Sequence, residues 1–294
     1  MTSITVGRLA PVNQWDQNLL DRLFANKLYP TGIEFRRVDG YPSSHDGCVL
    51  IVPGRYWAGR EAEISAAIAQ YSWLLMIVTS DEESTFDIGK VDHSSQQLWL
   101  QTPRVGREYD ARLIPVGFPP HFDSLPAGPP DKPLDVFMAA QCTHDRRSRA
   151  FDALARVARP KYVQTTAGFT QGRPPAEYTH LMLQAKVAPC PSGAVSPDSF
   201  RVYEALESHT IPIVDDISPA YDSRGYWERM FPDAPFPILT NYDDLPGYID
   251  DVLADYPRLA NRIAAWWIQT KRRYALWLKE DLEALGALAD ETRS

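Results

Sequence analysis

The sequence predicts two α/β domains in series, each built on a mostly parallel sheet. Short apolar runs alternate with helical periods over residues 4–116, and the same rhythm starts again over residues 134–215. A stretch rich in Pro and Gly, residues 115–130, interrupts the pattern between them. Because this alternation is typical of βαβ units, we expect a first domain over residues 1–120 and a second over residues 121–294.

The first half contains short apolar or β-branched runs that predict strands at residues 4–9, 32–38, 48–52, 73–78, 98–100 and 113–116. Helical periods fall between them at residues 15–24 and 62–71. The run Trp73–Val78 is apolar without a break, which is typical of a parallel strand covered on both faces.

The second half repeats the alternation, with strands predicted at residues 134–140, 162–166, 187–189 and 211–215 and helices at residues 145–157, 176–184 and 199–208. From residue 245 to about residue 288 the pattern is helical almost throughout. The aromatic residues of this segment are expected to pack in the core.

Composition excludes several classes of protein. The chain has 30 Lys and Arg against 38 Asp and Glu, so it lacks the basic surplus that phosphate neutralisation usually requires. No apolar run reaches the roughly 18 residues of a membrane span, and the first residues do not resemble a signal peptide, so we expect a cytoplasmic protein. Cys48, Cys142 and Cys190 follow no metal-binding pattern, which predicts buried reduced thiols.

Residues 186–214 carry the most informative pattern. A strand ends in a loop rich in Pro, Ser and Gly, and a helix follows with Asp198 or Ser199 as its N-cap. Free backbone amides at such a helix start bind phosphate, and Arg201 would add a charge-assisted contact. Glu204 lies on the same helical face and can accept hydrogen bonds from a ribose diol. The alternative is an ordinary strand, loop and helix without a ligand.

The run SFRVYEALE at residues 199–207, followed by IPIV at residues 211–214, resembles the donor-domain signature of the exostosin-like glycosyltransferases and, more loosely, of the wider GT-B retaining families. The resemblance is strong over about 30 residues and weak over residues 134–240. It implies two Rossmann-like domains facing a cleft, with a helical C-terminal segment that crosses back.

In those families the glutamate before Ala-Leu holds the donor's ribose, while the loop and the helix start receive its phosphates. The matching residues are Glu204 for the ribose, and Ser192, Gly193, Ser199 and Arg201 for the phosphates. The wider families place a second glutamate about seven residues earlier, and this chain has none there. Either Asp198 or backbone amides take its place, which leaves retaining and inverting chemistry both open.

A second candidate segment opens the predicted helix at residue 145. Thr143 precedes two arginines, Arg146 and Arg147, and the segment is similar to the first strand and loop of the same donor domains. Either arginine would offset the charge of the departing diphosphate, a role that a metal takes in other transferases. The alternative is that both arginines face solvent on the helix.

In the first half, Asp81 follows the apolar strand that ends at Val78. Ligands of open α/β sheets lie at this end of the strands, so Asp81 is our candidate for the general base that activates the acceptor hydroxyl. An acidic cluster favoured by a helix dipole is the alternative. Asp81 and Glu83 also have the spacing to chelate a cation, but no Asp-x-Asp motif occurs, and we expect no metal dependence.

Together these patterns predict a metal-independent glycosyltransferase that moves a hexosyl or pentosyl group from a nucleoside diphosphate sugar, a UDP-sugar first, to a glycan or another hydroxyl acceptor. No other cofactor is implied. Three alternatives stay open: a nucleotide-sugar epimerase, a non-catalytic nucleotide-sugar-binding module, and a bacteriophage-type enzyme acting on a hydroxymethylated DNA base. The last would need a local basic groove, for which residues 271–273 are the candidate.

Overall fold

The structure is a computed structural model that describes residues 3–43, 46–91, 96–104, 108–123, 125–126, 131–168, 171–218 and 225–288. The chain divides into two compact units. Unit 1 comprises Met1–Val116 together with Gln269–Ser294, and unit 2 comprises Gly117–Ile268. The last residues of the chain therefore group with unit 1. The sequence analysis counted them in the second domain and expected the C-terminal helical segment to cross back.

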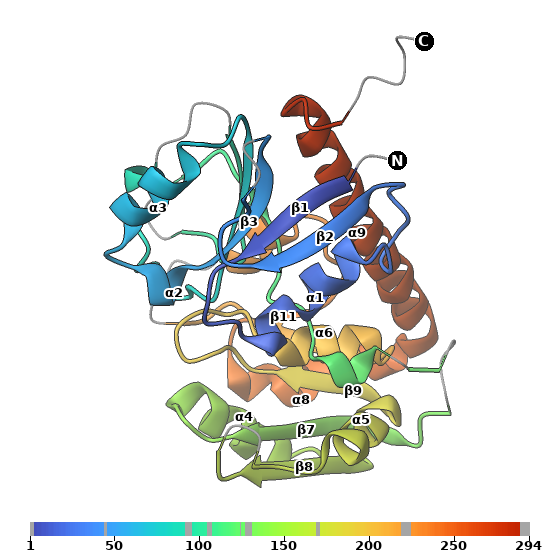
Figure 1. Cartoon of the computed structure of the whole chain (residues 1–294). Helices are drawn as coiled ribbons and strands as arrows, with labels where there is room; N and C mark the ends of the chain where they lie inside the picture. Colours follow the sequence, from blue (N-terminus) through green and yellow to red (C-terminus); the bar gives the residue numbers. More distant parts are fainter. Residues whose placement is uncertain are drawn as a thin grey trace. The chain divides into compact units, whose positions relative to one another are not determined.

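Unit 1 is built on a six-stranded sheet, sheet 1, in which every neighbouring pair is parallel and the order is β2-β1-β3-β4-β5-β6. Its strands are β1 (Ser3–Arg8), β2 (Glu34–Asp39), β3 (Cys48–Pro53), β4 (Leu74–Thr79), β5 (Gln96–Leu100) and β6 (Arg112–Leu113). The helices between them are α1 (Gln14–Phe24), α2 (Gly54–Trp57), α3 (Glu61–Ile68) and the short η1 (Ile88–Lys90). In Figure 1, α1 lies on one face of the sheet and α2 and α3 lie on the other.

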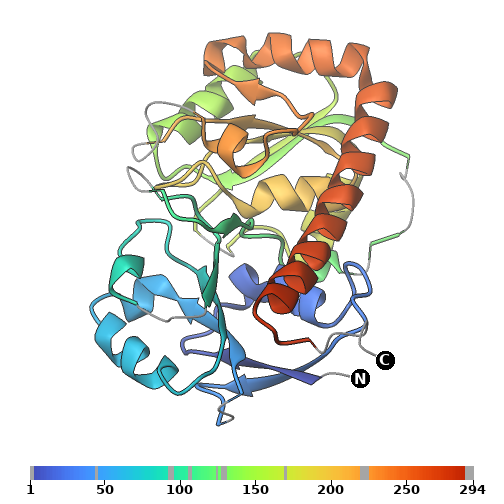
Figure 2. The same cartoon turned by 90° about the horizontal axis from the view of Figure 1, so that it is seen from above.

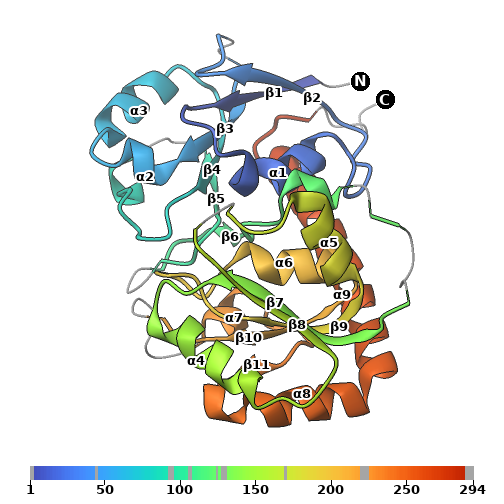
Figure 3. The same cartoon turned by 90° about the horizontal axis from the view of Figure 1, so that it is seen from below.

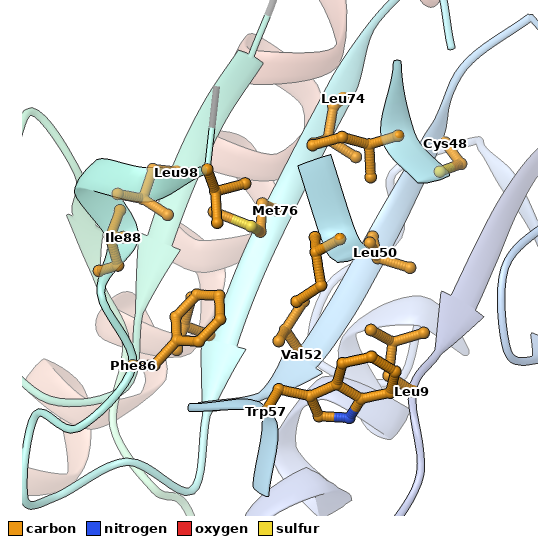
Figure 4. Close-up of a cluster of buried hydrophobic side chains, with 14 of the residues drawn as sticks. Leu9, Cys48, Leu50, Val52, Trp57, Leu74, Met76, Phe86, Ile88 and Leu98 are labelled. Carbon is orange, nitrogen blue, oxygen red and sulfur yellow. The ribbon is translucent and has the colours of Figure 1, made fainter. Parts of the chain in front are cut away.

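The core of unit 1 follows from the apolar runs of β3 and β4, whose residues are all buried. Alternate side chains of a strand point to opposite faces, so Cys48, Leu50 and Val52 share one face with Leu74 and Met76. Figure 4 shows these side chains meeting Trp57 of α2 and Phe86 of the loop after β4. A strand buried on both faces needs this unbroken apolar character, as the sequence predicts for residues 73–78.

Unit 2 is built on a five-stranded parallel sheet, sheet 2, in the order β11-β10-β9-β7-β8. Its strands are β7 (Leu134–Gln141), β8 (Lys161–Thr166), β9 (Ala185–Cys190), β10 (Ile211–Asp215) and β11 (Ile238–Leu239). Its helices are η2 (Pro120–Phe122), α4 (Asp145–Ala155), α5 (Pro175–Leu183), α6 (Phe200–Glu207), α7 (Tyr226–Met230), η4 (Tyr242–Asp244) and α8 (Leu245–Ala254). Figure 3 shows α5 and α6 on one face of sheet 2 and α4 and α8 on the other.

The C-terminal segment is helical almost throughout (Figure 2), in two helices, α8 and α9 (Tyr256–Ala284). Within unit 2, Trp267 of α9 is 2% exposed and its ring lies 5.9 Å from that of Tyr203 in α6. Within unit 1, Asp281 accepts a hydrogen bond from Trp99 of β5 at 2.6 Å. Trp267 and Tyr274 of this segment are buried, as expected from the sequence, whereas Trp266 and Trp277 are half-buried.

Two further observations bear on the expectations from composition. Cys48 and Cys190 are buried free thiols, but Cys142 is exposed, so the expectation that all three are buried is wrong for this residue. Cys142 is exposed because it directly follows the last residue of β7, in the loop that leaves sheet 2. None of the helices in the described part of the chain is long and apolar enough to cross a membrane.

Candidate functional site

The topology of sheet 2 selects one part of its edge for a ligand. From β7 the chain continues to β8 on one side, whereas from β9 it continues to β10 on the other side, so the strand order reverses between β7 and β9. Open α/β sheets bind ligands outside the carboxyl ends of their strands at such a reversal. The loops at this point are residues 142–144 and residues 191–199. Both segments singled out in the sequence therefore meet at one edge.

Arg146 joins these two loops directly. From the first turn of α4, its Nε donates to Ser192 Oγ at 2.8 Å, and its Nη2 donates to the carbonyl of Gly193 at 2.8 Å. Ser192 is fully buried, and its Oγ donates to the carbonyl of Ile217 after β10 at 2.8 Å. The structure thus brings Arg146 together with Ser192 and Gly193, two other predicted donor-site residues that lie 46 and 47 positions further along the sequence.

Arg147 is a buried cation that forms no ion pair with an acidic side chain of the described residues, although the charge of Asp215 acts on it. Its side chain is 8% exposed, and Nη1 makes long hydrogen bonds to the carbonyl of Gln141 at 3.3 Å and to Thr143 Oγ1 at 3.4 Å. Its Nε is buried without a partner among the described residues. Burial and, after it, the nearby charge of Arg201 lower the pKa of Arg147 to about 10. A desolvated guanidinium with a spare donor is a site for an anionic ligand.

Three more polar side chains at this edge have buried atoms without partners in the described residues. They are the hydroxyls of Ser196 and Ser199 and, by hydrogen-bond geometry, both ring nitrogens of His144, whose ring lies near the backbone of Ser192. Ser199 is the N-cap of α6, yet its side chain makes no capping hydrogen bond. Burial and then the charges of Arg146 and Arg147 lower the pKa of His144 to about 4, so this imidazole is neutral at pH 7. Buried polar groups normally have partners, so this concentration indicates that a polar ligand supplies them.

Glu204 lies in α6 with its carboxylate 4% exposed. Its Oε2 accepts a hydrogen bond from the phenol of Tyr178 in α5 at 2.6 Å. Burial raises the pKa of Glu204, while the Tyr178 hydrogen bond and the charge of Arg201 lower it. Tyr178 is in turn held between aromatic side chains, with ring centroids 6.3 Å from Phe122 and 5.3 Å from Phe137. Sequence reasoning missed Tyr178, because nothing in its own helix distinguishes it.

Arg201 and Asp198 flank the start of α6. Arg201 Nε donates to the carbonyl of Ala139 in β7 at 3.0 Å, which ties α6 to the other side of the reversal. Asp198 is 2% exposed and accepts a hydrogen bond from Tyr203 at 2.6 Å. This contact commits Asp198 to holding the loop onto its own helix, and the N-cap of α6 is Ser199. Neither His144 nor Ser196 was a site residue in the sequence analysis, because a lone His or Ser carries no signal there.

The structure argues against Asp81 as a general base. Its carboxylate is 3% exposed and forms an ion pair with Arg104 at 2.5 Å. Oδ1 also accepts from the amide and the hydroxyl of Thr85, at 2.9 and 2.7 Å, and Oδ2 accepts from the amide of Phe86 at 3.1 Å. Both oxygens are therefore occupied in folding the loop after β4. The described residues contain no group of three or more His, Cys, Asp or Glu placed to hold a metal ion.

Solved structures of glycosyltransferases resemble this chain over almost its whole length. Anabaena HepE, solved in complex with UDP and glucose, has a TM-score of 0.55 at 10% identity, over 97% of this chain and 100% of that one. The calicheamicin glycosyltransferase CalG4 has a TM-score of 0.45 at 12% identity, over 96% and 99% of the two chains. AviGT4, a glycosyltransferase involved in avilamycin A biosynthesis, has a TM-score of 0.45 at 15% identity, over 93% and 98%.

The sequence itself matches no protein-family model and no curated protein. At identities this low, likeness to a solved structure shows the fold alone. The alignment with HepE extends over both α/β units of this chain, with 97% of this chain and 100% of HepE covered. The chain therefore has the two-domain α/β fold of the GT-B type.

Proposed function

We propose that this protein is a glycosyltransferase whose unit 2 binds a nucleoside diphosphate sugar and donates its sugar to a hydroxyl acceptor. The observation that carries the proposal is the group of unpartnered polar atoms of Arg147, His144, Ser196 and Ser199 at the reversal of sheet 2. A diphosphate is the ligand class that suits them, because it accepts hydrogen bonds from every one of these groups.

The diphosphate would lie at the start of α6, between the loops after β7 and β9. Backbone amides at a helix start and the guanidinium of Arg147 then face its charge. Arg146, which donates to Ser192 and Gly193, would add positive charge from the loop. During transfer the bond from the sugar C1 to the diphosphate oxygen breaks, and the leaving diphosphate keeps the electron pair. The positive charge of the arginines stabilises that developing anion, which is the reason we propose a transfer independent of metal.

Glu204 would hold the ribose of the same donor. A buried carboxylate fixed by one hydrogen bond can accept others from a ribose diol without reorganising, and Tyr178 provides that fixation at 2.6 Å. The proposal that the base is uracil has one support outside the chain: HepE, which shares the fold, was solved with UDP and glucose.

A thermal-shift screen against UDP, GDP, ADP, CMP and TDP, each with and without EDTA, tests the donor site. A nucleotide that binds the folded protein raises the melting temperature by an amount set by its affinity. We expect UDP to give the largest shift, and we expect EDTA to leave that shift unchanged. If none of the five nucleotides raises the melting temperature, the proposed function is wrong.

Two pairs of variants locate the site. Arg147→Met removes the buried cation, whereas Arg149→Met changes an exposed arginine of the same helix that contacts Asn241 at 3.0 Å. Glu204→Gln removes the carboxylate of the proposed ribose ligand. Its control is Glu207→Gln, a change in the same helix that keeps an oxygen to accept the hydrogen bond from Trp267 of α9. We expect about tenfold or greater loss of UDP affinity in the first member of each pair and little change in the second. If both members of each pair lost UDP affinity to the same extent, the diphosphate would not bind at Arg147 and the ribose would not bind at Glu204.

A further inference from the structure

Three side chains of unit 2 form a hydrogen-bonded network at the carboxyl end of β8. Arg173, in the loop after β8, donates from Nε to the phenol oxygen of Tyr162 at 2.9 Å. The phenol donates in turn to Oε1 of Gln164 at 2.5 Å. Arg173 Nε also lies 3.4 Å from Gln164 Oε1. We call these three residues the Gln164 network.

The direction of these hydrogen bonds fixes the amide of Gln164. A guanidinium has donors and no acceptor, so the phenol oxygen accepts from Arg173 and its own proton is left for Gln164. Gln164 must then turn Oε1 toward Tyr162, because its amide nitrogen cannot accept. The two N–H groups of Nε2 donate to no residue in the described part of the chain. Gln164 thus presents an oriented hydrogen-bond donor.

Gln164 lies on the face of sheet 2 that α5 covers. The register of β7 and β8 places Phe137 opposite Tyr162, and the two rings stack with centroids 5.7 Å apart and planes at 12°. Phe137 also meets the ring of Tyr178 in α5 at 5.3 Å, so Phe137 and Tyr162 are on the α5 face. Side chains two residues apart on a strand share a face, which puts Gln164 there too, nearer the carboxyl end.

The same face carries the proposed ribose ligand, Glu204, which accepts from Tyr178. Ala139, the residue of β7 that pairs with Gln164, accepts through its carbonyl from Arg201 of α6 at 3.0 Å. Gln164 is therefore one strand away from a position that α6 contacts, and the side chain at that position is a methyl group. The diphosphate would lie between the loops after β7 and β9. The base, at the other end of the nucleotide, would then lie on the β8 side of the ribose.

The loop after β8 is folded back onto the end of the strand. Gly172 comes so close to Thr166 that a Cβ atom on this glycine would lie 3.0 Å from Thr166 Cγ2. The next residue, Arg173, forms an ion pair with Glu177 in the first turn of α5 at 2.7 Å. Its guanidinium lies over the Tyr162 ring, 5.7 Å from the centroid. Strand, loop and helix thus all contact the Gln164 network, at the sheet edge where such folds bind ligands.

We propose that Gln164 is a specificity-determining residue of the donor site, which recognises the base through its amide N–H groups. The inference rests on the proposed function and adds the class of base. Uracil carries a carbonyl at position 4, where cytosine carries an amine, and hypoxanthine and adenine differ in the same way at position 6. An oriented N–H donates to the carbonyl, whereas it meets the hydrogens of the amine. Gln164 therefore selects bases with a carbonyl at this position, uracil among them, and rejects cytosine and adenine.

The experiment compares nucleotides that differ in this group and in the proton of the adjacent ring nitrogen. Calorimetry gives the dissociation constants of UDP and CDP, and of IDP and ADP, for the whole protein. The ratio within each pair cancels any change that acts on both members alike, such as one of net charge. Wild type should bind UDP about tenfold or more tightly than CDP, because the amine leaves the amide donor unpaired. A wild-type ratio close to one in both pairs overturns the proposal.

Gln164→Glu replaces the donor by an acceptor and keeps the rest of the Gln164 network. One carboxylate oxygen can accept from Tyr162 and Arg173, as Oε1 does, and the other can accept from an amine. The preference for UDP over CDP should fall by about tenfold or more, so that CDP binds at least as tightly. Gln184→Glu, the same chemical change at the C-cap of α5 beside His180, is the matched control and should keep the wild-type ratio. An unchanged ratio in Gln164→Glu overturns the proposal.

Arg173→Met tests whether the direction of the hydrogen bonds matters. Without the guanidinium the phenol of Tyr162 can accept as well as donate, so the amide of Gln164 can turn either way. The preference for UDP over CDP should then disappear. Arg159→Met, which removes an exposed arginine ion-paired with Asp250, should keep it. If Arg173→Met weakened both nucleotides equally, Arg173 would only support the loop, and this result would contradict the proposed orientation of Gln164.

These outcomes separate the inference from the proposed function. If the wild-type protein binds none of the four nucleotides, both are wrong. If it binds them and loses affinity in Arg147→Met and Glu204→Gln, the donor site stands. A base preference that Gln164→Glu leaves unchanged then overturns the inference alone.

Discussion

The phenol of Tyr178 donates a hydrogen bond of 2.6 Å to Glu204 Oε2, and it is the donor that the described residues provide to this carboxylate. The contact joins α5 to α6 across 26 residues of sequence. Glu204 is 4% exposed, and burial raises the pKa of its carboxyl group. The hydrogen bond from Tyr178 offsets part of that rise. Tyr178 thereby orients Glu204 and favours its charged form.

Tyr178→Phe should make UDP affinity depend on pH. Without the phenol the pKa of Glu204 rises further, so more of the carboxyl is protonated near neutral pH and can no longer accept from the ribose diol. We expect roughly tenfold weaker binding than wild type at pH 6 and a smaller gap at pH 8.5, measured by calorimetry. The 2′-deoxy nucleotide dUDP lacks one hydroxyl of the diol, and it should show a smaller penalty. A penalty that is the same at both pH values and for both nucleotides would mean that Tyr178 only supports the fold.

His144 should make the folded protein less stable as the solution becomes acidic. Its folded pKa is about 4, below the ordinary 6.5, so between these values the unfolded chain binds a proton that the folded chain does not. Stability is therefore complete above pH 6.5 and falls as pH decreases toward 4. Between pH 7 and pH 4.5 the wild-type protein loses free energy of unfolding, and His144→Asn should make that loss smaller by about 1–2 kcal/mol. Urea midpoints of both proteins at these two pH values check this, and parallel curves would contradict it.

Cys142 should be the cysteine that reacts with alkylating reagents in the folded protein. It is exposed, whereas Cys48 and Cys190 are buried, and burial raises the pKa of Cys48 to about 12. Mass spectrometry after brief treatment with N-ethylmaleimide should find one adduct, absent in Cys142→Ser. Because Cys142 adjoins the proposed diphosphate site, UDP should slow the reaction several-fold. Labelling that UDP does not affect would place the nucleotide elsewhere.

Lys132 should matter for stability and not for the donor site. Its buried amino group, whose pKa burial lowers to about 7, donates to the carbonyls of Leu183 and Ala185, both at 2.8 Å, and to that of Ser208 at 3.1 Å. These carbonyls lie at the amino ends of the strands and at the helix ends, away from the reversal loops. Lys132→Met leaves them without a donor and should cost about 2–4 kcal/mol in the free energy of unfolding. UDP affinity at a temperature where the variant is folded should be unchanged.

Much of the fold was predictable from local patterns. The unbroken apolar runs of β3 and β4 and the strand, loop and helix at residues 186–214 depend on residues close together in the sequence. A strand buried on both faces requires consecutive apolar residues, and the start of a helix requires a capping residue. Both requirements concern neighbouring residues, so they can be recognised in the sequence. The segment that contains Ser192, Ser199, Arg201 and Glu204 was recognisable for the same reason.

The pairing of polar side chains was not predictable. Arg146 and Ser192 are 46 residues apart, and they meet because β7 and β9 are neighbours in sheet 2. In the sequence Asp81 has a good position for a general base, directly after an apolar strand, and only its contact with Arg104, 23 residues away, shows that its charge is already compensated. The sequence by itself determined which residues form the strands and where polar side chains leave them. The tertiary structure decided which of those side chains are paired, because strand order brings together residues that no local pattern connects.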